Sequence, residues 1–208
     1  MKKNFYLIKS TEQLQELFNN KTIFLEKGCE LIISKKVKLK NFINFSGKVK
    51  IDCFSIINNN CHIHNSTIGL RNLIKYSSFI NDSKINSDNS IGPFCYIRDK
   101  VKVGRKNIIG AHTEITRTII KDENTVSHFS FIGDCKIGNK NIIGAGVVTA
   151  NYKSKKLKQL MTVIENNCVL GSNSTVIAPR RIKSEAIIAA GSTITKDVKR
   201  KEKIIQKN

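Results

Sequence analysis

Aliphatic residues recur every six positions along most of this chain, and this period constrains the fold more than any other feature. Between residues 91 and 143 they are six apart, with two steps of five: Ile91, Ile97, Val103, Ile109, Ile115, Ile120, Val126, Ile132, Ile137 and Ile143. This period matches neither an α-helix, at about 3.6, nor an alternating strand, at about 2.0. It is typical of a hexapeptide solenoid, in which three short strands form one triangular coil and the coils stack in parallel.

The repeat sets the expected domain organisation. It begins near Ile33 and continues to Ile194, so counting in threes predicts about nine coils in one domain over residues 31–198. The period is lost after Thr149 and resumes at Ile164, which predicts an inserted loop over 150–163. Four of the loop residues are lysines (Lys153, Lys155, Lys156 and Lys158). Because insertions in a solenoid project from one face, we expect this loop to line a site.

The two ends lie outside the repeat. Residues 1–30 are expected to form an N-terminal cap, because the open end of a solenoid exposes apolar side chains and unpaired strand edges. Ser10 and Gln13 resemble a capping box, and Leu14, Leu17 and Phe18 form an apolar stripe, which predicts a short helix over about 11–19. Residues 199–208 are expected to form a basic tail that leaves the repeat.

The charge balance raises the question of anionic partners. The chain has 36 Lys and Arg against 16 Asp and Glu, a formal charge of +20. Such a balance is found in proteins that bind nucleic acid, acidic membranes or anionic substrates. The basic residues are scattered, however, and Lys, Asn and Ile are all abundant, as expected of an AT-rich genome. We therefore expect no specific nucleic-acid partner.

Cysteine usage and hydropathy indicate a cytoplasmic protein. The six cysteines show no CxxC spacing and no signal peptide precedes them, so we expect reduced thiols that pack as small apolar residues. Cys61, His62 and His64 could supply metal ligands, but neighbours in a strand face opposite sides, which favours a surface role without metal. No apolar run approaches the ~18 residues of a membrane span.

Five segments of the chain resemble a known family. They are IGPFCYIR, SHFSFIGDCKIG, IIGAGVVTANY, VLGSNSTVIAP and IIAAGSTITKDV. Over residues 33–207 they are similar, in order and nearly in spacing, to the C-terminal domain of the bifunctional enzyme GlmU. That domain is a left-handed β-helix that N-acetylates glucosamine-1-phosphate. The chain leaves no room for the uridyltransferase half of that family, so the resemblance implies only the acetyltransferase activity.

The resemblance implies His128 as the catalytic base. Acetyl transfer from a thioester to an amine needs no enzyme nucleophile, but the amine must lose a proton and the thioester oxygen must be stabilised. A histidine, with an ordinary pKa near ~6.5, suits an amine whose pKa is about 8. His128, within SHFSFIGD, occupies the family's base position.

The residues implied for the acceptor depart in part from the family. Arg98 matches the arginine that binds the sugar phosphate, and its planar fork suits bidentate phosphate contact. The family has a lysine two residues after the position of Glu114, whereas this chain has Thr116 followed by Arg117. In a strand, the side chain of that neighbour would face the other side. The family's tyrosine and asparagine fall on two further positions, Phe131 and Ile142, and Asn151 is retained.

The residues implied for acetyl-CoA are better kept. Asn151 and Tyr152 match an Asn-Tyr pair at the start of the inserted loop, and Lys207 falls on an arginine that meets coenzyme phosphate. Small residues that would line the acetyl-CoA groove are Ala145, Ser172 and Ala190. The family further implies a homotrimer with each active site at a seam between subunits.

The sequence therefore predicts an acetyl-CoA-dependent N-acetyltransferase for an amino sugar phosphate, with glucosamine-1-phosphate as the first candidate. Three alternatives stay open. The acceptor could be another amine or a hydroxyl, such as a nucleotide-linked amino sugar. A metal-dependent hydratase of the same fold needs three converging histidines, and the four histidines here are not so spaced. A non-catalytic basic scaffold would account for the charge.

Overall fold

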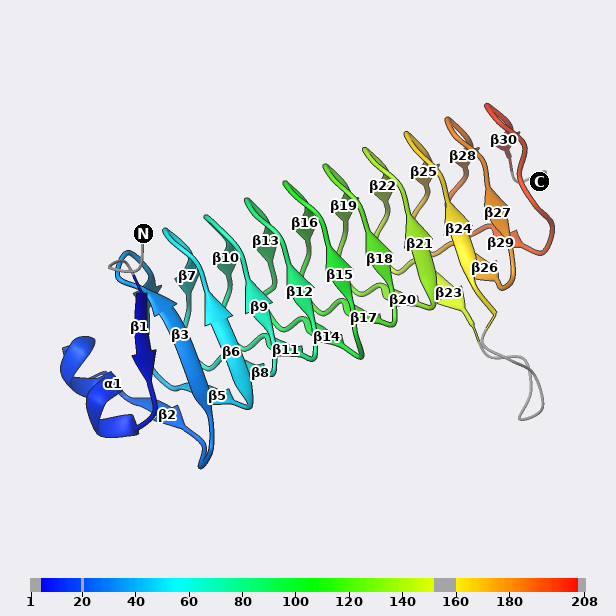
Figure 1. Ribbon diagram of the computed structural model, residues 1–208. Coiled ribbons are helices and arrows are strands. Elements are labelled where there is room, and N and C mark those ends of the chain that lie inside the picture. Colours follow the sequence, from blue (N-terminus) through cyan, green and yellow to red (C-terminus); the bar gives the residue numbers. More distant parts are fainter. Residues whose placement is uncertain (1–4, 20, 152–159, 206–208) are drawn as a thin grey trace.

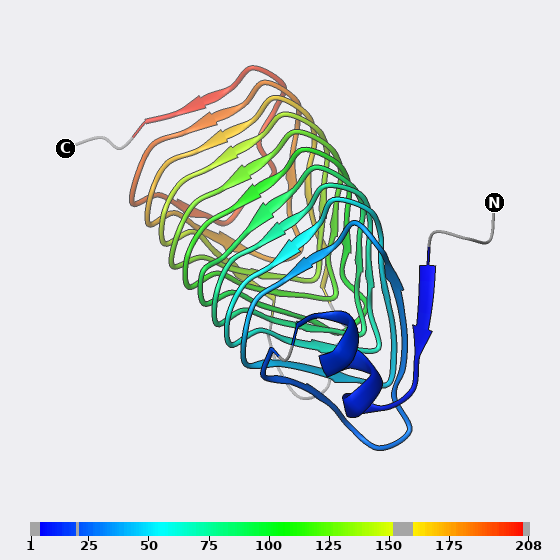
Figure 2. The ribbon, with the colours of Figure 1, turned by 90° about the vertical axis from the view of Figure 1, so that its left-hand side faces the viewer.

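The aliphatic residues of the six-residue period form one continuous core in the computed structural model of this protein. The structure describes residues 5–19, 21–151 and 160–205. Each coil contains three short strands, so the stack is a triangular prism and the fold is a left-handed parallel β-helix (Figures 1 and 2). The isoleucines at the centre of this pattern, such as Ile97, Ile109 and Ile120, are at most 1% exposed. The expected fold class is confirmed.

Each of the three faces of the prism is one ten-stranded sheet. Sheet A contains β1 (Phe5–Ile8), β3 (Glu30–Ser34), β6 (Lys48–Ile51), β9 (Thr67–Ile68), β12 (Lys84–Ile85), β15 (Lys102–Val103), β18 (Ile119–Ile120), β21 (Cys135–Ile137), β24 (Thr162–Ile164) and β27 (Arg181–Ile182). Sheet B contains β2 (Ile23–Leu25), β5 (Ile43–Ser46), β8 (His62–His64), β11 (Phe79–Asn81), β14 (Tyr96–Arg98), β17 (Glu114–Thr116), β20 (Phe131–Gly133), β23 (Val148–Ala150), β26 (Thr175–Ile177) and β29 (Thr193–Ile194). Sheet C contains β4 (Lys38–Leu39), β7 (Ile56–Ile57), β10 (Leu73–Ile74), β13 (Ser90–Ile91), β16 (Ile108–Ile109), β19 (Thr125–Val126), β22 (Ile142–Ile143), β25 (Val169–Leu170), β28 (Ile187–Ile188) and β30 (Lys203–Ile204).

The chain visits the sheets in the order B, A, C, and it turns at three corners. Many corner residues have positive φ, including Asp99 (60°), Arg117 (49°) and Phe129 (57°). Because a left-handed conformation ends a strand and reverses its side-chain alternation, each corner re-aims the chain onto the next face. The C/B corner, which joins sheet C to sheet B, lies opposite sheet A.

A column of buried asparagines fixes the register at the entrance to sheet C. It contains Asn72, Asn89, Asn107, Asn124 and Asn141. The side-chain oxygens of the first four accept hydrogen bonds from the backbone and side-chain amides of the asparagine one coil on, at 2.8 to 3.1 Å. That of Asn141 accepts from the backbone N–H of Cys168 at 2.8 Å. Because the polar groups of the column are hydrogen-bonded, burying them does not carry the free-energy cost of unpaired groups. Coils that slipped by one residue would lose these hydrogen bonds.

The expected N-terminal cap is present, with one more coil than the period predicted. Helix α1 spans Thr11–Leu17, and the Ser10 hydroxyl accepts a hydrogen bond from the backbone N–H of Gln13. The stack begins at β2, before Ile33, because β2 pairs in parallel with β5. The prediction of nine coils is therefore one short of the ten strands in each sheet. Strand β1 adds to sheet A antiparallel, through its pairing with β3.

The C-terminal end also differs from expectation. Residues 199–208 were expected to leave the repeat, but Lys203–Ile204 forms β30, which pairs in parallel with β28. Ile204 packs against the end of the core, so its burial keeps this segment on the stack. The start of the expected basic tail is therefore a strand of sheet C.

The cysteines pack as expected. Five of the six are buried, Cys53 is half-buried, and all are free thiols. Burial raises the pKa of Cys61 and Cys95 to about 11 and that of Cys135 to about 12. Cys61 points into the core while His62 points outward, so the two do not converge on one ion. Among the described helices, none is long and apolar enough to cross a membrane.

Candidate active site

His128 lies at the C/B corner, in the turn between β19 and β20. Its side chain is exposed, and its ring meets that of Phe129 edge-on, with centroids 6.4 Å apart. Its backbone carbonyl accepts a hydrogen bond from the Gly146 N–H at 2.9 Å, which ties this turn to the next coil. Within the described part of the chain, neither ring nitrogen has a hydrogen-bond partner. The backbone of this turn therefore fixes the position of His128, and its ring nitrogens are available to a bound molecule.

A glycine makes room for this imidazole. Gly110 lies one coil below His128, and a Cβ added there would come within 3.0 Å of the His128 backbone nitrogen and 3.1 Å of Nδ1. Such contacts are tighter than most Cβ contacts in proteins, so a larger residue at position 110 would require the turn that carries His128 to shift by a few tenths of an ångström.

The residues expected to line the acetyl-CoA groove form one column with His128. Successive carbonyls of this column accept from the next coil: His128 from Gly146 at 2.9 Å, Ala145 from Asn173 at 2.8 Å, and Ser172 from Gly191 at 2.8 Å. Ala190 follows on the next coil. Ser172 and Ala190 are exposed and Ala145 is half-buried. The column on the C-terminal side of His128 thus carries the small side chains of Ala145, Ser172 and Ala190, which leaves that edge open to an extended molecule.

The expected acceptor residues gather at the other end of the sheet B strands, where sheet B turns into sheet A. Arg98, at the end of β14, donates from Nε and Nη2 to Oε1 of Glu114 at 3.0 and 2.7 Å. Its Nη1 donates to Asp99. The Glu114 carboxylate raises the pKa of Arg98. A phosphate bound by Arg98 would compete with two carboxylates, so this site favours a ligand that reaches the guanidinium from its open side.

Arg117 does not face away from this cluster, contrary to the expectation from strand alternation. Strand β17 ends at Thr116, and Arg117 has a left-handed conformation, so its side chain returns to the same corner. Arg117 Nη1 donates to the Thr116 hydroxyl at 3.0 Å and to Asp99 at 3.4 Å. Thr116 itself is fully buried and donates to Asp99 at 2.9 Å. Position 116 therefore cannot contact an acceptor, whereas Arg117 is one-third exposed.

Two aspartates at this corner were missed by the sequence reasoning. Asp134 accepts from Arg117 Nε and Nη2 at 2.7 and 2.9 Å, and from the side-chain amide of Asn151. Asp99 joins Arg98, Thr116 and Arg117. The signal for Asp134 was present, because it ends the SHFSFIGD segment that contains the expected base. Asp99 had no such signal, and its role depends on the corner geometry.

The remaining expected residues lie on two different faces. Phe131 and Glu114 are paired neighbours on the outer face of sheet B, between His128 and the arginine cluster. Ile142 lies on the outer face of sheet C, where it is 54% exposed. One chain therefore does not bring Phe131 and Ile142 together. Tyr152 and Lys207, and the four lysines of the inserted loop, lie outside the described residues. Across the described ranges, no group of three or more His, Cys, Asp or Glu side chains could hold a metal ion.

Comparison with known proteins agrees with the repeat and the fold. Residues 82–117 and 161–196 match the family model for the bacterial transferase hexapeptide (six repeats). The chain is 37% identical over 183 residues to the bifunctional protein GlmU of Wigglesworthia glossinidia brevipalpis. That match covers 88% of this chain and 38% of GlmU. For GlmU of Clostridioides difficile the identity is 39%, over 75% of this chain and 33% of the relative. The chain thus spans little more than a third of these relatives.

Solved structures confirm the fold. The structure of an Arabidopsis UDP-N-acetylglucosamine acyltransferase matches with a TM-score of 0.73 at 18% identity, over 86% of this chain and 68% of that one. At this identity the likeness concerns the fold alone. The repeat, the β-helix and the sequence identity agree with one another. Over residues 82–117 and 161–196 this chain is similar to the hexapeptide repeats of bacterial transferases, and it is similar to GlmU over the part of GlmU that it spans.

Proposed function

We propose that this protein N-acetylates an amino sugar phosphate with acetyl-CoA, and that glucosamine-1-phosphate is the acceptor to test first. The observation that carries the proposal is the column at the C/B corner. There a histidine whose ring nitrogens have no hydrogen-bond partner among the described residues is followed, in hydrogen-bonded register, by Ala145, Ser172 and Ala190. An extended thioester can lie along the small residues with its carbonyl beside His128.

In the proposed reaction the acceptor amine attacks the thioester carbonyl carbon, and the C–S bond breaks after a tetrahedral intermediate has formed. His128 takes the proton that the amine loses and returns it to the departing thiolate, so the histidine ends as it began. The reaction needs no metal and no enzyme nucleophile, because a thioester is already activated. We also infer that the reaction takes place in the cytoplasm.

The arginine cluster supplies the proposed acceptor site. Arg98 and Arg117 would attract the sugar phosphate, while Asp134 and Asn151 hold Arg117 in place. Since Thr116 is buried, the cation of this site is supplied by Arg117 from the next position. The half-buried Phe131 and the exposed Ile142 offer no hydrogen bond to a sugar hydroxyl. This favours, as a second candidate, an acceptor with an apolar or planar extension, such as a nucleotide-linked amino sugar.

We further propose a homotrimer with the active site between subunits. The support is the distribution of the assigned residues over sheet B, sheet C and two corners of one chain, because surfaces that point apart in one subunit can meet across a seam. Exposed isoleucines on sheet C suit such a seam, since burying them against another copy removes apolar area from water.

The test is release of free thiol from acetyl-CoA across a panel of acceptors. The panel contains glucosamine-1-phosphate, glucosamine-6-phosphate, unphosphorylated glucosamine and nucleotide-linked amino sugars. Turnover of glucosamine-1-phosphate supports the first candidate, and preference for a nucleotide-linked sugar supports the second. Absence of thiol release with every amine, on protein shown to be folded, would contradict the proposal.

A further inference from the structure

The outer face of sheet A carries an ordered row of lysines that the proposed reaction does not use. Three strands of sheet A each contribute one exposed lysine, namely Lys84 in β12, Lys102 in β15 and Lys136 in β21, and the exposed Lys121 directly follows β18, which lies between β15 and β21. Lys84 pairs directly with Lys102, and Lys136 pairs with Ile119, two residues before Lys121. Because neighbouring strands lie about 4.8 Å apart, this lysine row spans about 14 Å along the prism.

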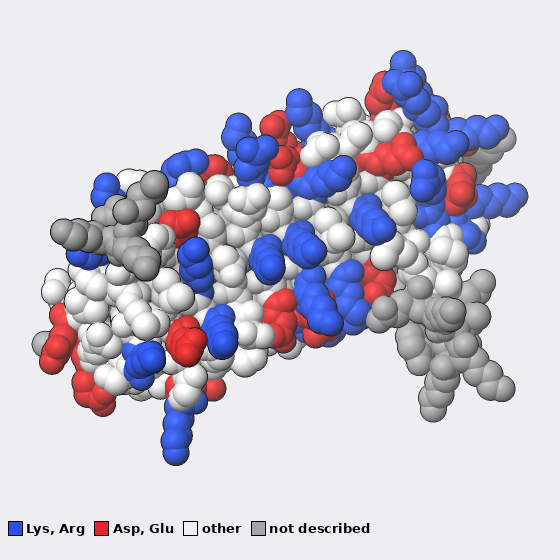
Figure 3. All heavy atoms as spheres, in the orientation of Figure 1, with Lys and Arg blue, Asp and Glu red and all other residues white. Residues whose placement is uncertain are grey.

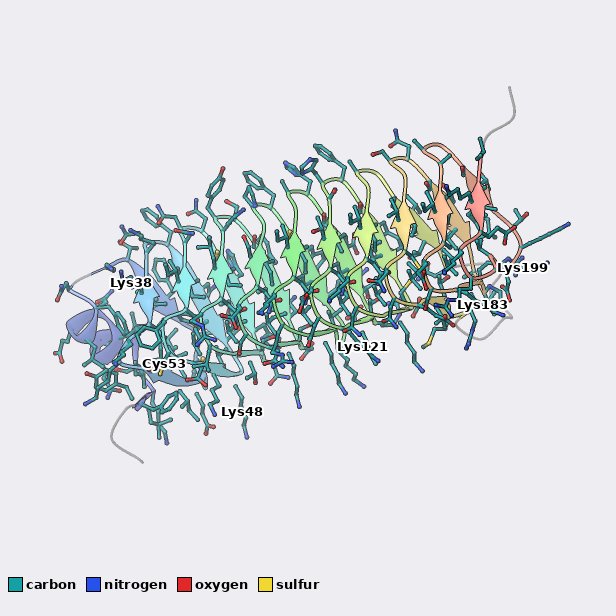
Figure 4. The ribbon with its side chains drawn as sticks, turned by 90° about the horizontal axis from the view of Figure 1, so that it is seen from above. Lys38, Lys48, Cys53, Lys121, Lys183 and Lys199 are labelled. Atoms are coloured by element: carbon teal, nitrogen blue, oxygen red, sulfur yellow. The ribbon has the colours of Figure 1, made fainter. Side chains whose placement is uncertain are left out.

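The figures show how the row is placed. Sheet A faces the viewer in Figure 3, where basic side chains run along the middle of the face and most acidic ones lie toward its borders. From above, Lys48, Lys121 and Lys183 lie along one long side of the stack (Figure 4). This face is opposite the C/B corner that carries His128, so a partner bound here leaves the proposed coenzyme edge open.

Within the described ranges of the chain, the lysine row is not neutralised by carboxylates. Six arginines are matched with carboxylates: Arg71 with Asp88, Arg98 with Glu114, Arg105 with Asp122, Arg117 with Asp134, Arg181 with Glu165 and Arg200 with Glu185. By contrast, among the described residues none of the four row lysines has an ion-pair partner. Like charges on directly paired strand positions destabilise a sheet, so the Lys84–Lys102 pair has a cost that no internal contact offsets.

The row lies in a shallow concave tract. A depression of about 960 Å³ is lined by Lys84, Lys102 and Ile119 together with Asp82 and Asp99, and it also reaches Arg117 and Asp134 of the proposed acceptor site. A second, of about 460 Å³, shares Lys84 and Lys102 and adds Lys121. A third, of about 370 Å³, shares Lys121 and adds Lys136. The shared lysines make the three depressions one tract along the prism axis.

The shape and charge of this tract select its occupant. A flat anionic membrane cannot follow a concave tract, and the carboxylates of Asp82 and Asp99 within the tract would repel it. A narrow chain of phosphates can enter between them, and a nucleic-acid duplex carries a negative charge about every 1.7 Å of its axis. Among the residues that the structure describes, no aromatic side chain lines the three depressions, so these residues offer no platform for base stacking. We propose that the lysine row binds nucleic acid through its phosphates, without reading the base sequence.

The test uses a fluorescently labelled DNA duplex of about 20 base pairs and mixed sequence, with anisotropy measured from about 50 to 200 mM salt. The variant replaces Lys84, Lys102, Lys121 and Lys136 by Ala. The control replaces Lys9, Lys27, Lys196 and Lys199 by Ala, which are exposed lysines near the two ends of the chain. Each lost phosphate contact lowers the slope of log K against log salt by about 0.9, so the variant should lose about three to four units and the control less than one. A second duplex of different sequence should bind equally.

Three results would overturn the proposal. Wild-type protein could fail to bind the duplex at the lowest salt, or the two variants could lose slope equally, which would indicate net charge alone. The variant could instead keep duplex binding while losing binding to vesicles that contain anionic phospholipid, which would identify a membrane surface. Circular dichroism and sedimentation confirm that each variant folds. If the fourfold variant does not, the pair Lys84→Ala with Lys121→Ala should lose about half the slope change.

Discussion

Arg117 and Asp134 form a two-point ion pair between adjacent coils, with Nε–Oδ1 and Nη2–Oδ2 distances of 2.7 and 2.9 Å. The Asp134 side chain is only 6% exposed, and it also accepts from Asn151. The pair raises the pKa of Arg117 and fixes two residues of the proposed site relative to each other. One buried carboxylate thus links the acceptor cluster to the start of the inserted loop.

Asp134→Asn should therefore destabilise the protein and weaken acceptor binding. Removing one partner of a mostly buried pair leaves the other without compensation, which costs about 3 kcal/mol. The measurements are the denaturant midpoint and the KM for the acceptor. Glu123→Gln is the control, because its contact with Lys140 is 3.9 Å long and exposed, and pairs of that kind contribute at most about 1 kcal/mol. Equal midpoints for the two variants would contradict the role given to Asp134.

His128→Ala should lower the rate of the chemical step without affecting the affinity for acetyl-CoA. Loss of a general base typically reduces kcat by 10²–10⁴-fold, roughly, and the remaining rate should rise with pH as more of the amine is deprotonated. Calorimetry should give an unchanged Kd for acetyl-CoA. The matched control is His64→Ala, an exposed histidine whose Nδ1 contacts Ser46 on another part of sheet B. If His128→Ala retains near wild-type kcat, the histidine is only a corner residue.

Arg98→Ala should raise the KM for a phosphorylated acceptor and have little effect with an unphosphorylated one. A charge-assisted hydrogen bond contributes about 1.5–3 kcal/mol, which corresponds to roughly a 10- to 150-fold change. Arg105→Ala is a close control, because Arg105 also forms a two-point pair, with Asp122, but at a different corner. An equal rise in KM for the phosphorylated and the unphosphorylated acceptor would show that Arg98 does not bind the phosphate.

The proposed assembly predicts a mass of about three times 23.4 kDa in sedimentation equilibrium. Ile108→Asp, on sheet C, should shift the protein toward monomer, because it puts a charge into the proposed apolar seam. Ile119→Asp, on sheet A, should leave the mass unchanged. Ile108 is 53% exposed and Ile119 is 40% exposed, so the two substitutions differ chiefly in the face that they alter. A monomer with full acetyltransferase activity would contradict the shared site.

Stability should fall at alkaline pH because of the buried thiols. Burial raises the pKa of Cys61 from 9.0 to about 11 and that of Cys135 to about 12. Above about pH 9 the unfolded thiols lose protons while the folded ones keep them, so the unfolded state binds fewer protons and the free energy of unfolding decreases as pH rises. The check is the denaturant midpoint between pH 8 and 11. Cys61→Ala, compared at each pH with wild type, should flatten this dependence.

The sequence was sufficient to predict the fold because nearly every core position follows one pattern, the six-residue period. The period failed where the core is built from other spacings. The first coil was missed because Ile23 and Leu31 precede the regular run, and β30 was assigned to a tail because basic residues surround Ile204. Packing against the preceding coil, rather than local pattern, determines both ends.

The candidate site was predictable only in part. The alignment of His128 with Ala145, Ser172 and Ala190 follows from the period once the corners are known, and the structure places all four in one column. The orientation of Arg117 did not follow, because alternation applies within a strand and this residue lies just beyond one, at a φ of 49°. Side-chain directions at the corners therefore cannot be predicted from strand alternation.

Helix α1 has a consequence for the particle as a whole. The Thr11 hydroxyl accepts from the backbone N–H of Leu25 at 3.2 Å and contacts its carbonyl at 3.5 Å, so the outer edge of the first sheet B strand is occupied. Without this plug, the rod would present a bare template onto which a second rod could add end to end. The cap thus makes the two ends of the solenoid unequal, because at the N-terminal end the edge of sheet B is already occupied and is less able to pair with a second copy.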